Sequence, residues 1–230
     1  MPPVFSKAGF TLAEVLITLG IIGVVAAITI PGLITAHQKH VVETKLEKAV
    51  SSLNQVIRLS EDENGQMENW DKTLPHKEFI DRYFRPYMKI MQLCNPVKDC
   101  GYKTGGSSTW KSMNGSYGNY AGANYRGRTP MLAMDGIVYT FNFLNDGGAV
   151  EVDNDKTIII DINSYQGPNQ FGKDVFFLYR VEEADSIIPY GANKTKKEIQ
   201  NDCSKTGTGM YCAALIRENG WKIPNGYPFK

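Results

Sequence analysis

The sequence predicts an α+β protein in which one long N-terminal helix packs on an antiparallel β-sheet, with additional loops and short helices. Two observations lead to this class. Near the N-terminus, an apolar run from Phe10 to Ile30 is followed by a stretch whose apolar residues recur at helical spacings. Beyond residue 130, short apolar segments with a period of two are separated by turn residues, which is typical of an antiparallel meander.

The apolar run is long enough to cross a membrane. As one helix it would rise about 31 Å, against a hydrocarbon core of roughly 30 Å. Its only formally charged side chain is Glu14, and an acidic residue inside a spanning helix usually marks a function or a partner. A secretory signal peptide cut near Val25–Ala27 and a plain membrane anchor both leave Glu14 unexplained. The run is also too long and too uniform for the buried helix of a globular core.

The stretch KAGFTLAEVLITLGIIGVVAAITIP, residues 7–31, resembles the N-terminus of type IV prepilins and type II secretion pseudopilins. The resemblance implies a leader over residues 1–9, which a prepilin peptidase removes by cutting between Gly9 and Phe10. It also implies that Phe10 becomes the N-methylated first residue. Glu14 matches the glutamate of this family.

The chemistry of the run offers a reason to keep Glu14. Cleavage after Gly9 would free an α-amino group at Phe10, with an unperturbed pKa of about 7.7–8.0. In a filament, that amine could neutralise Glu14 of a neighbouring subunit in surroundings of low dielectric constant, where either charge alone is penalised. We therefore expect Glu14 to be costly in the monomer and satisfied in the polymer, as an assembly residue.

The leader sets the expected orientation. Lys7 and the initial amine precede the apolar run, and positive residues favour the cytoplasmic side of a membrane. We expect a single-pass protein of the cytoplasmic (inner) membrane whose globular domain, residues 64–230, is extracytoplasmic and joins a periplasmic or cell-surface filament. The resemblance implies four partners: other copies and pilin-like subunits, the prepilin peptidase, an inner-membrane assembly platform and membrane lipid.

The N-terminal helix is expected to have a transmembrane half, residues 10–30, and an amphipathic half, residues 31–63. Pro31, which matches the family's proline, should bend it or loosen the preceding turn. The helix should run from Phe10 to about Ser60 and stop at the sequence EDENG. Its buried face is expected to hold Val42, Leu46, Ala49, Val50, Leu53, Val56 and Ile57. Its other faces are expected to hold Lys39, Glu43, Lys45, Glu47, Lys48 and Arg58.

Two segments of the globular domain precede the strands. Residues 76–91 carry an apolar and aromatic helical stripe, interrupted by Pro86, which indicates a core helix rather than a cofactor site. Residues 94–128 are rich in Gly, Ser, Asn and Tyr and predict a long surface loop. Their aromatic and basic residues could stack on single-stranded nucleic acid. However, a net charge of +1 gives no general attraction to nucleic acid, and none is expected as a partner.

The strands are predicted from their period and their turns. MLAMDGIVYTFNFL, residues 131–144, predicts a hairpin with a two-residue type I′ connection at Asp135–Gly136. Further strands are predicted at AVEVD (149–153), KTIIIDIN (156–163) and DVFFLYRV (174–181).

The segment that begins at the end of the strand predicted at residues 156–163 raises the question of calcium. Asp161 and Asn163 alternate like oxygen ligands, and some secretion pseudopilins bind calcium near their C-terminal region. An EF-hand needs a further oxygen donor, a Gly and a Glu at its fifth, sixth and twelfth positions, which here hold Tyr165, Gln166 and Gly172. A turn at Gly167–Pro168 is therefore favoured, and no metal is expected.

The four cysteines suggest disulfides in an exported chain. Three connectivities are possible, and we favour the local pairs Cys94–Cys100 and Cys203–Cys212. A four-thiolate zinc site is the alternative, but the short C-x-x-C spacing is missing and an oxidising compartment disfavours it.

Catalytic motifs are missing from the sequence. The glycine-rich GYKTGGSST, residues 101–109, lacks the lysine of a phosphate-binding loop, and there is no HExxH or G-x-S-x-G. His37 and His40 share a helical face, but no acidic or cysteine ligand is placed beside them. We expect that the protein binds no cofactor and is not an enzyme. The prediction is a subunit of a type II secretion pseudopilus or type IV pilus. The alternative is a membrane-tethered extracytoplasmic binding or enzymatic domain that does not polymerise.

Overall fold

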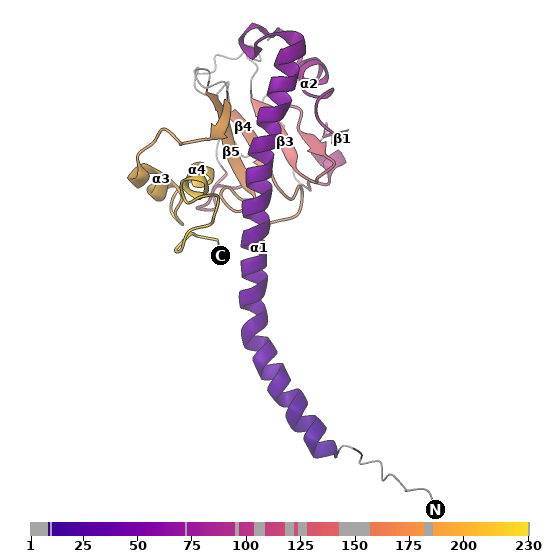
Figure 1. The fold of residues 1–230 in the computed structure, drawn as a ribbon, viewed down its shortest axis with the longest axis vertical. Coiled ribbons are helices and arrows are strands. Elements are labelled where there is room, and N and C mark those ends of the chain that lie inside the picture. Colours follow the sequence, from indigo (N-terminus) through magenta and orange to yellow (C-terminus); the bar gives the residue numbers. More distant parts are fainter. Residues whose placement is uncertain are drawn as a thin grey trace, which may run out of the picture. The chain divides into compact units, whose positions relative to one another are not determined.

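In the computed structural model, the chain forms two compact units, residues 1–40 and 41–230. Figure 1 shows both units, with their elements labelled. The long helix α1 is followed by a six-stranded antiparallel sheet and short helices, which confirms the α+β class. The structure describes residues 9, 11–71, 73–94, 97–103, 109–117, 122–123, 128–142, 157–181 and 186–229.

Helix α1, Leu12–Asn64, is a single helix of 53 residues that contains Pro31. In the second unit its buried face is the one predicted from the helical spacing. All seven predicted apolar residues between Val42 and Ile57 are buried, each with at most 8% of its surface exposed. These positions repeat every three to four residues, so they form one stripe that packs on the sheet.

The end of α1 differs from the prediction. The helix continues past Ser60 through the charged residues and ends at Asn64. Gly65 follows with a φ of +76°, and its backbone N–H donates to the carbonyl oxygen of Glu61 at 2.9 Å. A glycine in the left-handed region is a common helix terminator, so the glycine ends the helix and the charges before it do not.

The sheet is a meander, because its strands are hydrogen-bonded in chain order. Every neighbouring pair is antiparallel, as predicted. The strands are β1 (Ile90–Leu93), β2 (Met131–Ala133), β3 (Val138–Asn142), β4 (Thr157–Asp161), β5 (Val175–Val181) and β6 (Ser186–Pro189).

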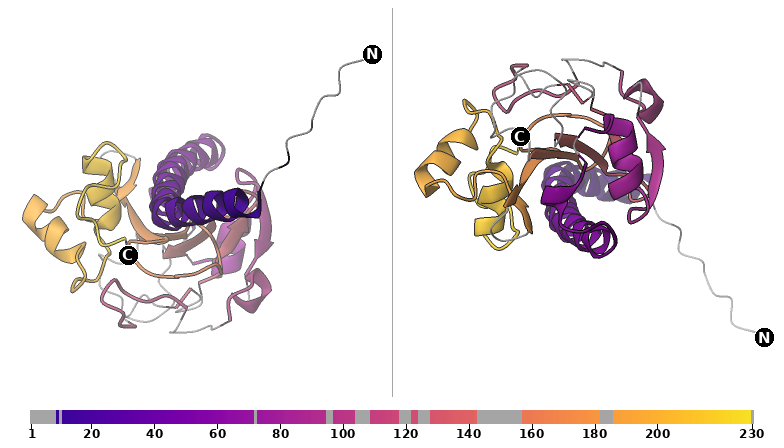
Figure 2. Two further views of the ribbon diagram at one scale, coloured as in Figure 1. Left: turned by 90° about the horizontal axis from the view of Figure 1, so that it is seen from below. Right: turned by 90° about the horizontal axis from the view of Figure 1, so that it is seen from above.

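Both faces of this sheet are covered. Successive side chains of a strand point to opposite faces. Ile158 and Ile160 of β4 accordingly belong to the core cluster that contains the buried stripe of α1, whereas Ile159 belongs to a second cluster with Trp110. Figure 2 shows the second half of α1 on one face, while segments that include the short helix η2, Val97–Cys100, lie on the other. Burial on both faces explains why β4 is apolar at consecutive positions.

The helix predicted over residues 76–91 is shorter in the structure. Helix α2 covers His76–Tyr83, and the chain then forms turns and enters strand β1. Pro86 has no N–H to continue the helical hydrogen bonds. The ring of Phe84 instead lies 4.1 Å from that of Phe141 on β3, measured between centroids, so the aromatic stripe is core as predicted.

The hairpin between β2 and β3 also differs in detail. The N–H of Ala133 donates to the carbonyl oxygen of Ile137 at 2.9 Å, which leaves a three-residue connection, Met134–Gly136. Of these three residues, only Gly136 has a positive φ, +80°. A type I′ turn needs a positive φ at both central residues, whereas a type I turn followed by a left-handed glycine needs one.

Four short helices complete the described part of the second unit, and strand β6 was not predicted. The helices are η1 (Met67–Asn69), η2, α3 (Lys196–Asp202) and α4 (Cys212–Glu218), in addition to α2. The strand predicted at residues 149–153 lies outside the described residues.

Candidate functional site

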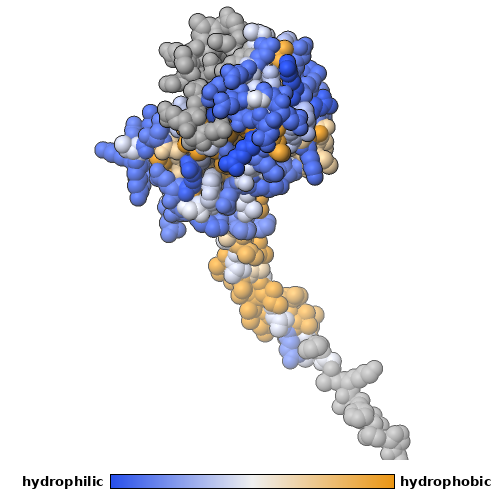
Figure 3. All heavy atoms as spheres, turned by 45° about the horizontal axis from the view of Figure 1, so that its top comes forward, coloured by the Kyte–Doolittle hydropathy of each residue, from blue (hydrophilic) through white to orange (hydrophobic). Residues whose placement is uncertain are grey.

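The first unit presents a continuous apolar surface. Every large apolar side chain between Leu12 and Ile34 is at least 41% exposed, and Figure 3 shows these side chains as an orange surface. By length and composition, α1 is the one described helix that could cross a membrane. This surface fits a single-pass membrane anchor or a helix that packs against other helices.

Glu14 has a hydrogen-bonding partner within its own chain. Its Oε2 accepts hydrogen bonds from the backbone N–H of Thr11 at 2.8 Å and from the Thr11 hydroxyl at 2.7 Å. The backbone N–H of Glu14 points back to Thr11 Oγ1 at 3.3 Å. This reciprocal pattern is a capping box, which satisfies two backbone N–H groups at the start of a helix.

Sequence reasoning missed the role of Thr11, although a signal was present. A Thr followed three residues later by a Glu, ahead of an apolar run, is the signature of a capping box. The same arrangement of Thr195 and Glu198 caps α3. The carboxylate of Glu14 therefore has two donors on one oxygen within its own chain, and its role in assembly stays a prediction.

The structure describes only some of the other residues of the predicted processing and assembly site. Lys7 and Phe10 lie outside the described residues, so the leader charge, the cleavage junction and the methylation site stay predictions. Gly9 is exposed, and a Cβ atom added there would meet nothing within 4 Å. Pro31 lies inside α1, where its carbonyl oxygen accepts a 2.9 Å hydrogen bond from the Thr35 hydroxyl. Its effect on the direction of the helix stays a prediction.

Glu43 fastens the C-terminal segment to α1. Its Oε1 accepts a hydrogen bond from the backbone N–H of Ile223 at 2.8 Å, and its Oε2 lies 3.1 Å from Lys222 Nζ. The Glu43 side chain is 11% exposed. The sequence placed Glu43 outside the apolar stripe but did not predict its burial, because its partner lies 180 residues further along the chain.

Two further side-chain contacts hold α1 against the sheet. Lys45 Nζ donates to the carbonyl oxygen of Ile162, just after β4, at 2.7 Å. Arg180 of β5 pairs with Glu61 at 2.9 Å, and these two side chains are 5% and 10% exposed. Charged groups therefore hold α1 against the sheet at both ends of the buried stripe of this helix.

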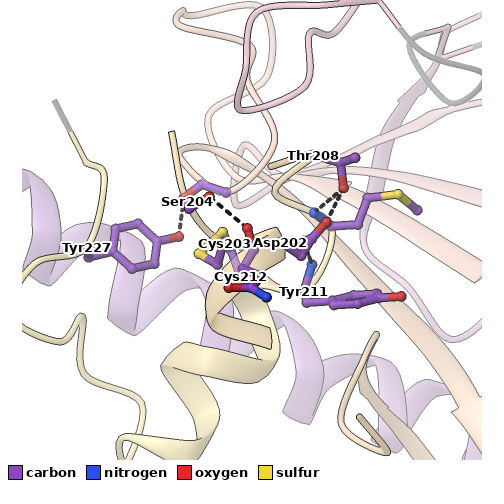
Figure 4. Close-up of a disulfide and its surroundings, with 10 residues drawn as sticks. Asp202, Cys203, Ser204, Thr208, Tyr211, Cys212 and Tyr227 are labelled. Atoms are coloured by element: carbon purple, nitrogen blue, oxygen red, sulfur yellow. Dashed lines mark hydrogen bonds between the residues drawn. A yellow bond between two sulfur atoms is a disulfide. The ribbon is translucent and has the colours of Figure 1, made fainter. Parts of the chain in front are cut away.

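The structure contains the two local disulfides that the sequence favours. Cys94–Cys100 and Cys203–Cys212 have Cα–Cα distances of 5.3 and 4.9 Å, and the chain has no free cysteine. The second disulfide joins the end of α3 to the start of α4 (Figure 4). Beside it, Asp202 accepts hydrogen bonds from the Thr208 hydroxyl and from the backbone N–H of Tyr211. The short connection between the two helices is therefore held by both covalent and polar contacts.

Asp161, considered above as a calcium ligand, is a buried structural carboxylate. Its Oδ2 accepts hydrogen bonds from the Tyr102 hydroxyl at 2.7 Å and from Trp110 Nε1 at 3.0 Å. Its Oδ1 accepts the backbone N–H of Asn163. Burial raises the pKa of the Asp161 carboxyl well above its usual range, and the charge of nearby Asp174 acts in the same direction.

Asp174 organises the turn that precedes β5. Its two carboxylate oxygens accept the backbone N–H groups of Asn169 at 2.8 Å and Gln170 at 2.7 Å. Burial raises the pKa of Asp174 to about 6, although the two N–H groups act in the opposite direction. Within the described residues, no group of three or more His, Cys, Asp or Glu side chains could hold a metal ion.

Two known protein families match different parts of the chain. Residues 32–230 match a family of unknown function (DUF6613). Residues 5–30 match the prokaryotic N-terminal methylation motif, the signature of prepilin-type cleavage and methylation. No curated protein and no solved structure matches the chain. The resemblance of the N-terminus to prepilins is therefore confirmed.

Proposed function

From the premise that the chain belongs to the family of unknown function DUF6613 and begins with a prepilin-type methylation motif, we propose that it is a structural subunit that polymerises through its N-terminal helix. The filament is a type II secretion pseudopilus or a type IV pilus. The methylation motif at residues 5–30 is the observation that carries the proposal.

Processing prepares the subunit for assembly. A prepilin peptidase cuts between Gly9 and Phe10, and the new α-amino group of Phe10 is methylated. Before cleavage the subunit spans the inner membrane once, with Lys7 on the cytoplasmic side and the second unit outside it. The exposed apolar side chains of α1 support this role, because they contact lipid in the membrane and other helices in the filament.

The pairing of Glu14 with Phe10 sets the register between neighbouring subunits in the filament. Thr11 holds Oε2 of Glu14 in the capping box, and among the described residues no hydrogen bond reaches Oε1. The amine of Phe10 from a neighbouring subunit pairs with this second oxygen. In a helix bundle of low dielectric constant, such a pair is attractive and a misplaced subunit leaves both charges unpaired.

Mass spectrometry of the membrane-extracted protein tests the processing step. The full chain is co-expressed with a prepilin peptidase and an assembly platform. The expected mature N-terminus is a methylated Phe10, and Gly9→Val should leave the leader attached, whereas Gly9→Ala, the smallest change, should be cut more readily. A wild-type N-terminus at Met1 or beyond Ala27 contradicts the proposal.

Assembly is tested separately by shearing filaments from the cells. Wild-type protein should appear in the sheared fraction, and omission of the peptidase should confine it to the membrane. A processed protein that stays wholly in the membrane fraction would favour a tethered binding or enzymatic domain instead.

A further inference from the structure

A groove with a volume of about 850 Å³ lies between α3, α4 and the C-terminal segment. Its buried lining residues include Cys203 and Tyr227, both drawn in Figure 4. Its exposed lining residues include Lys196, Lys205 and Glu218. The groove thus has a mixed polar and apolar lining and a rigid base, because the Cys203–Cys212 disulfide holds the two helices together.

The groove and its rim carry an excess of positive charge. Lys194 and Lys197 flank Lys196 at the start of α3, and all four lysines, with Lys205, are exposed. Within the described residues none of the four forms an ion pair. Two carboxylates lie nearby: Glu218 lines the groove, and Glu198, which also attracts Lys194, is engaged in the capping box of α3.

The opposite charge gathers where α1 ends. Asp62, Glu63 and Glu68 are exposed, and none of them forms an ion pair among the described residues, although Glu63 Oε2 accepts a hydrogen bond from the Tyr87 hydroxyl at 2.7 Å. Glu61 does not belong to this acidic surface, because Arg180 pairs with it in the interior. One domain therefore presents a basic groove and an acidic surface on different elements.

These two surfaces lie at opposite ends of the second unit. The wall of the groove formed by residues 224–228 begins directly after Ile223, which is hydrogen-bonded to Glu43 near the start of the buried part of α1. From Glu43 to Asp62 the helix rises about 30 Å. Figure 1 agrees, since α1 ends beside α2, at the far end of the unit from the C-terminus.

We propose that the basic groove of one copy receives the acidic end of α1 from a second copy. This inference rests on the proposed function, because it describes how neighbouring domains meet in the filament. A contact between two different surfaces is heterologous and can propagate without closing, whereas a self-complementary contact gives a closed dimer. The charges lie at the two ends of the domain, as a head-to-tail contact along a filament requires.

Solvent-exposed ion pairs are individually weak and are screened by salt. The contact therefore adds orientation and register to the helix packing instead of replacing it. The four lysines of one copy face the three carboxylates of the other, and these charges act together. Reversing two charges should therefore change filament assembly measurably, whereas removing one charge should not.

Charge reversal in the full-length chain tests the proposal. Lys196→Glu with Lys205→Glu should lower the amount of protein in sheared filaments severalfold, and Asp62→Lys with Glu68→Lys should do the same. The chain that carries all four substitutions should recover, because the complementarity is restored with its sign inverted. Lys98→Glu with Lys103→Glu is the matched control, since both lysines are exposed on η2 and just after it, away from the groove.

The outcomes separate this inference from the proposed function. Wild-type filaments that are unaffected by either reversal would overturn the contact and leave polymerisation standing. A loss that the fourfold variant does not restore would also overturn it, since the groove would then meet a different partner. If wild-type protein never enters filaments, polymerisation itself fails, and the contact between copies fails with it.

Discussion

The carboxylate of Glu43, near the start of the buried part of α1, accepts a hydrogen bond from the backbone N–H of Ile223 at the other end of the chain. The C-terminal segment is thereby attached to the helix that a filament would hold. Lys222 Nζ, 3.1 Å from Glu43 Oε2, adds a second contact between the same two segments.

Glu43→Ala should loosen the C-terminal segment. It removes the acceptor of a partly buried N–H, a change that typically costs about 1–3 kcal/mol of the free energy of unfolding. Hydrogen exchange at the Ile223 amide should become faster. Lys222→Ala is the control, because the lysine side chain is 61% exposed and its pair with Glu43 should be worth less than about 1 kcal/mol. Equal exchange rates in the two variants would show that the backbone hydrogen bond is not what holds the segment.

The capping box allows the charge of Glu14 to be tested apart from its cap. Glu14→Gln removes the charge, but Gln still serves in a capping box. Filament incorporation should fall as far with Glu14→Gln as with Glu14→Val, because both lose the partner of the Phe10 amine. Thr11→Ala keeps the charge and loses the cap, so it should retain most of the incorporation.

The measurement compares sheared filaments with the membrane pool for each variant. Membrane insertion should be unchanged or improved in the two Glu14 variants, since a costly carboxylate is gone. Glu14→Lys should reduce filament incorporation the most, because it places a lysine cation opposite the cationic Phe10 amine of the neighbouring subunit. If Glu14→Gln assembles like the wild type while Thr11→Ala does not, the carboxylate acts as a cap and the pairing with the amine is wrong.

Helical and strand periodicity predicted the parts of the fold that depend on local patterns. The stripe from Val42 to Ile57 repeats over several turns, so its burial could be predicted without knowing what covers it. Strands β4 and β5 are apolar and β-branched or aromatic over most of their length, which favours a strand over any alternative. Helix propensity alone cannot locate an end, however, and α1 continues through its charged residues to Asn64.

The missed features depend on contacts distant in sequence. Glu43 has the residue type of a solvent face, and its burial follows from Ile223, which no local pattern reveals. Strand β6, Ser186–Pro189, has four residues whose sequence, SIIP, does not alternate between polar and apolar residues, and it forms because β5 offers it a partner. The register that pairs Ile187 with Arg180 is likewise a property of the sheet. Thr11 is the exception, since its capping motif was visible in the sequence.

The two disulfides should each stabilise the second unit. Closing loops as short as these contributes about 2–3 kcal/mol each in the chain-entropy account. Cys203→Ser with Cys212→Ser should lower the melting temperature and the incorporation into filaments, because this disulfide forms the base of the basic groove. Cys94→Ser with Cys100→Ser should lower the melting temperature by a similar amount and leave the groove intact. Labelling of the unreduced wild-type protein that finds four reactive thiols would contradict both pairs.

The stability of the second unit should fall as the pH rises from about 4 to about 7. Burial raises the pKa of Asp174 to about 6 from its ordinary value of 3.8. Between these values the unfolded chain has lost a proton that the folded chain still holds. A raised pKa therefore gives stability that is complete below the unfolded value and is lost as the pH passes the folded one. The loss from this group is on the order of 3 kcal/mol.

Asp174→Asn should remove most of that slope, because the amide does not ionise and can still accept one of the two backbone N–H groups, from Asn169 or Gln170. The free energy of unfolding, measured with denaturant at several pH values, should be lower than that of the wild type at pH 4. The two curves should then converge as the pH rises.

Asp81→Asn is the control of opposite sign. Lys77 and Arg85 lower the pKa of Asp81, so its contribution is lost on the acidic side. If Asp174→Asn keeps the full wild-type slope between pH 4 and 7, the buried carboxyl that titrates there is another one, and Asp161, whose pKa burial also raises, is the next to replace.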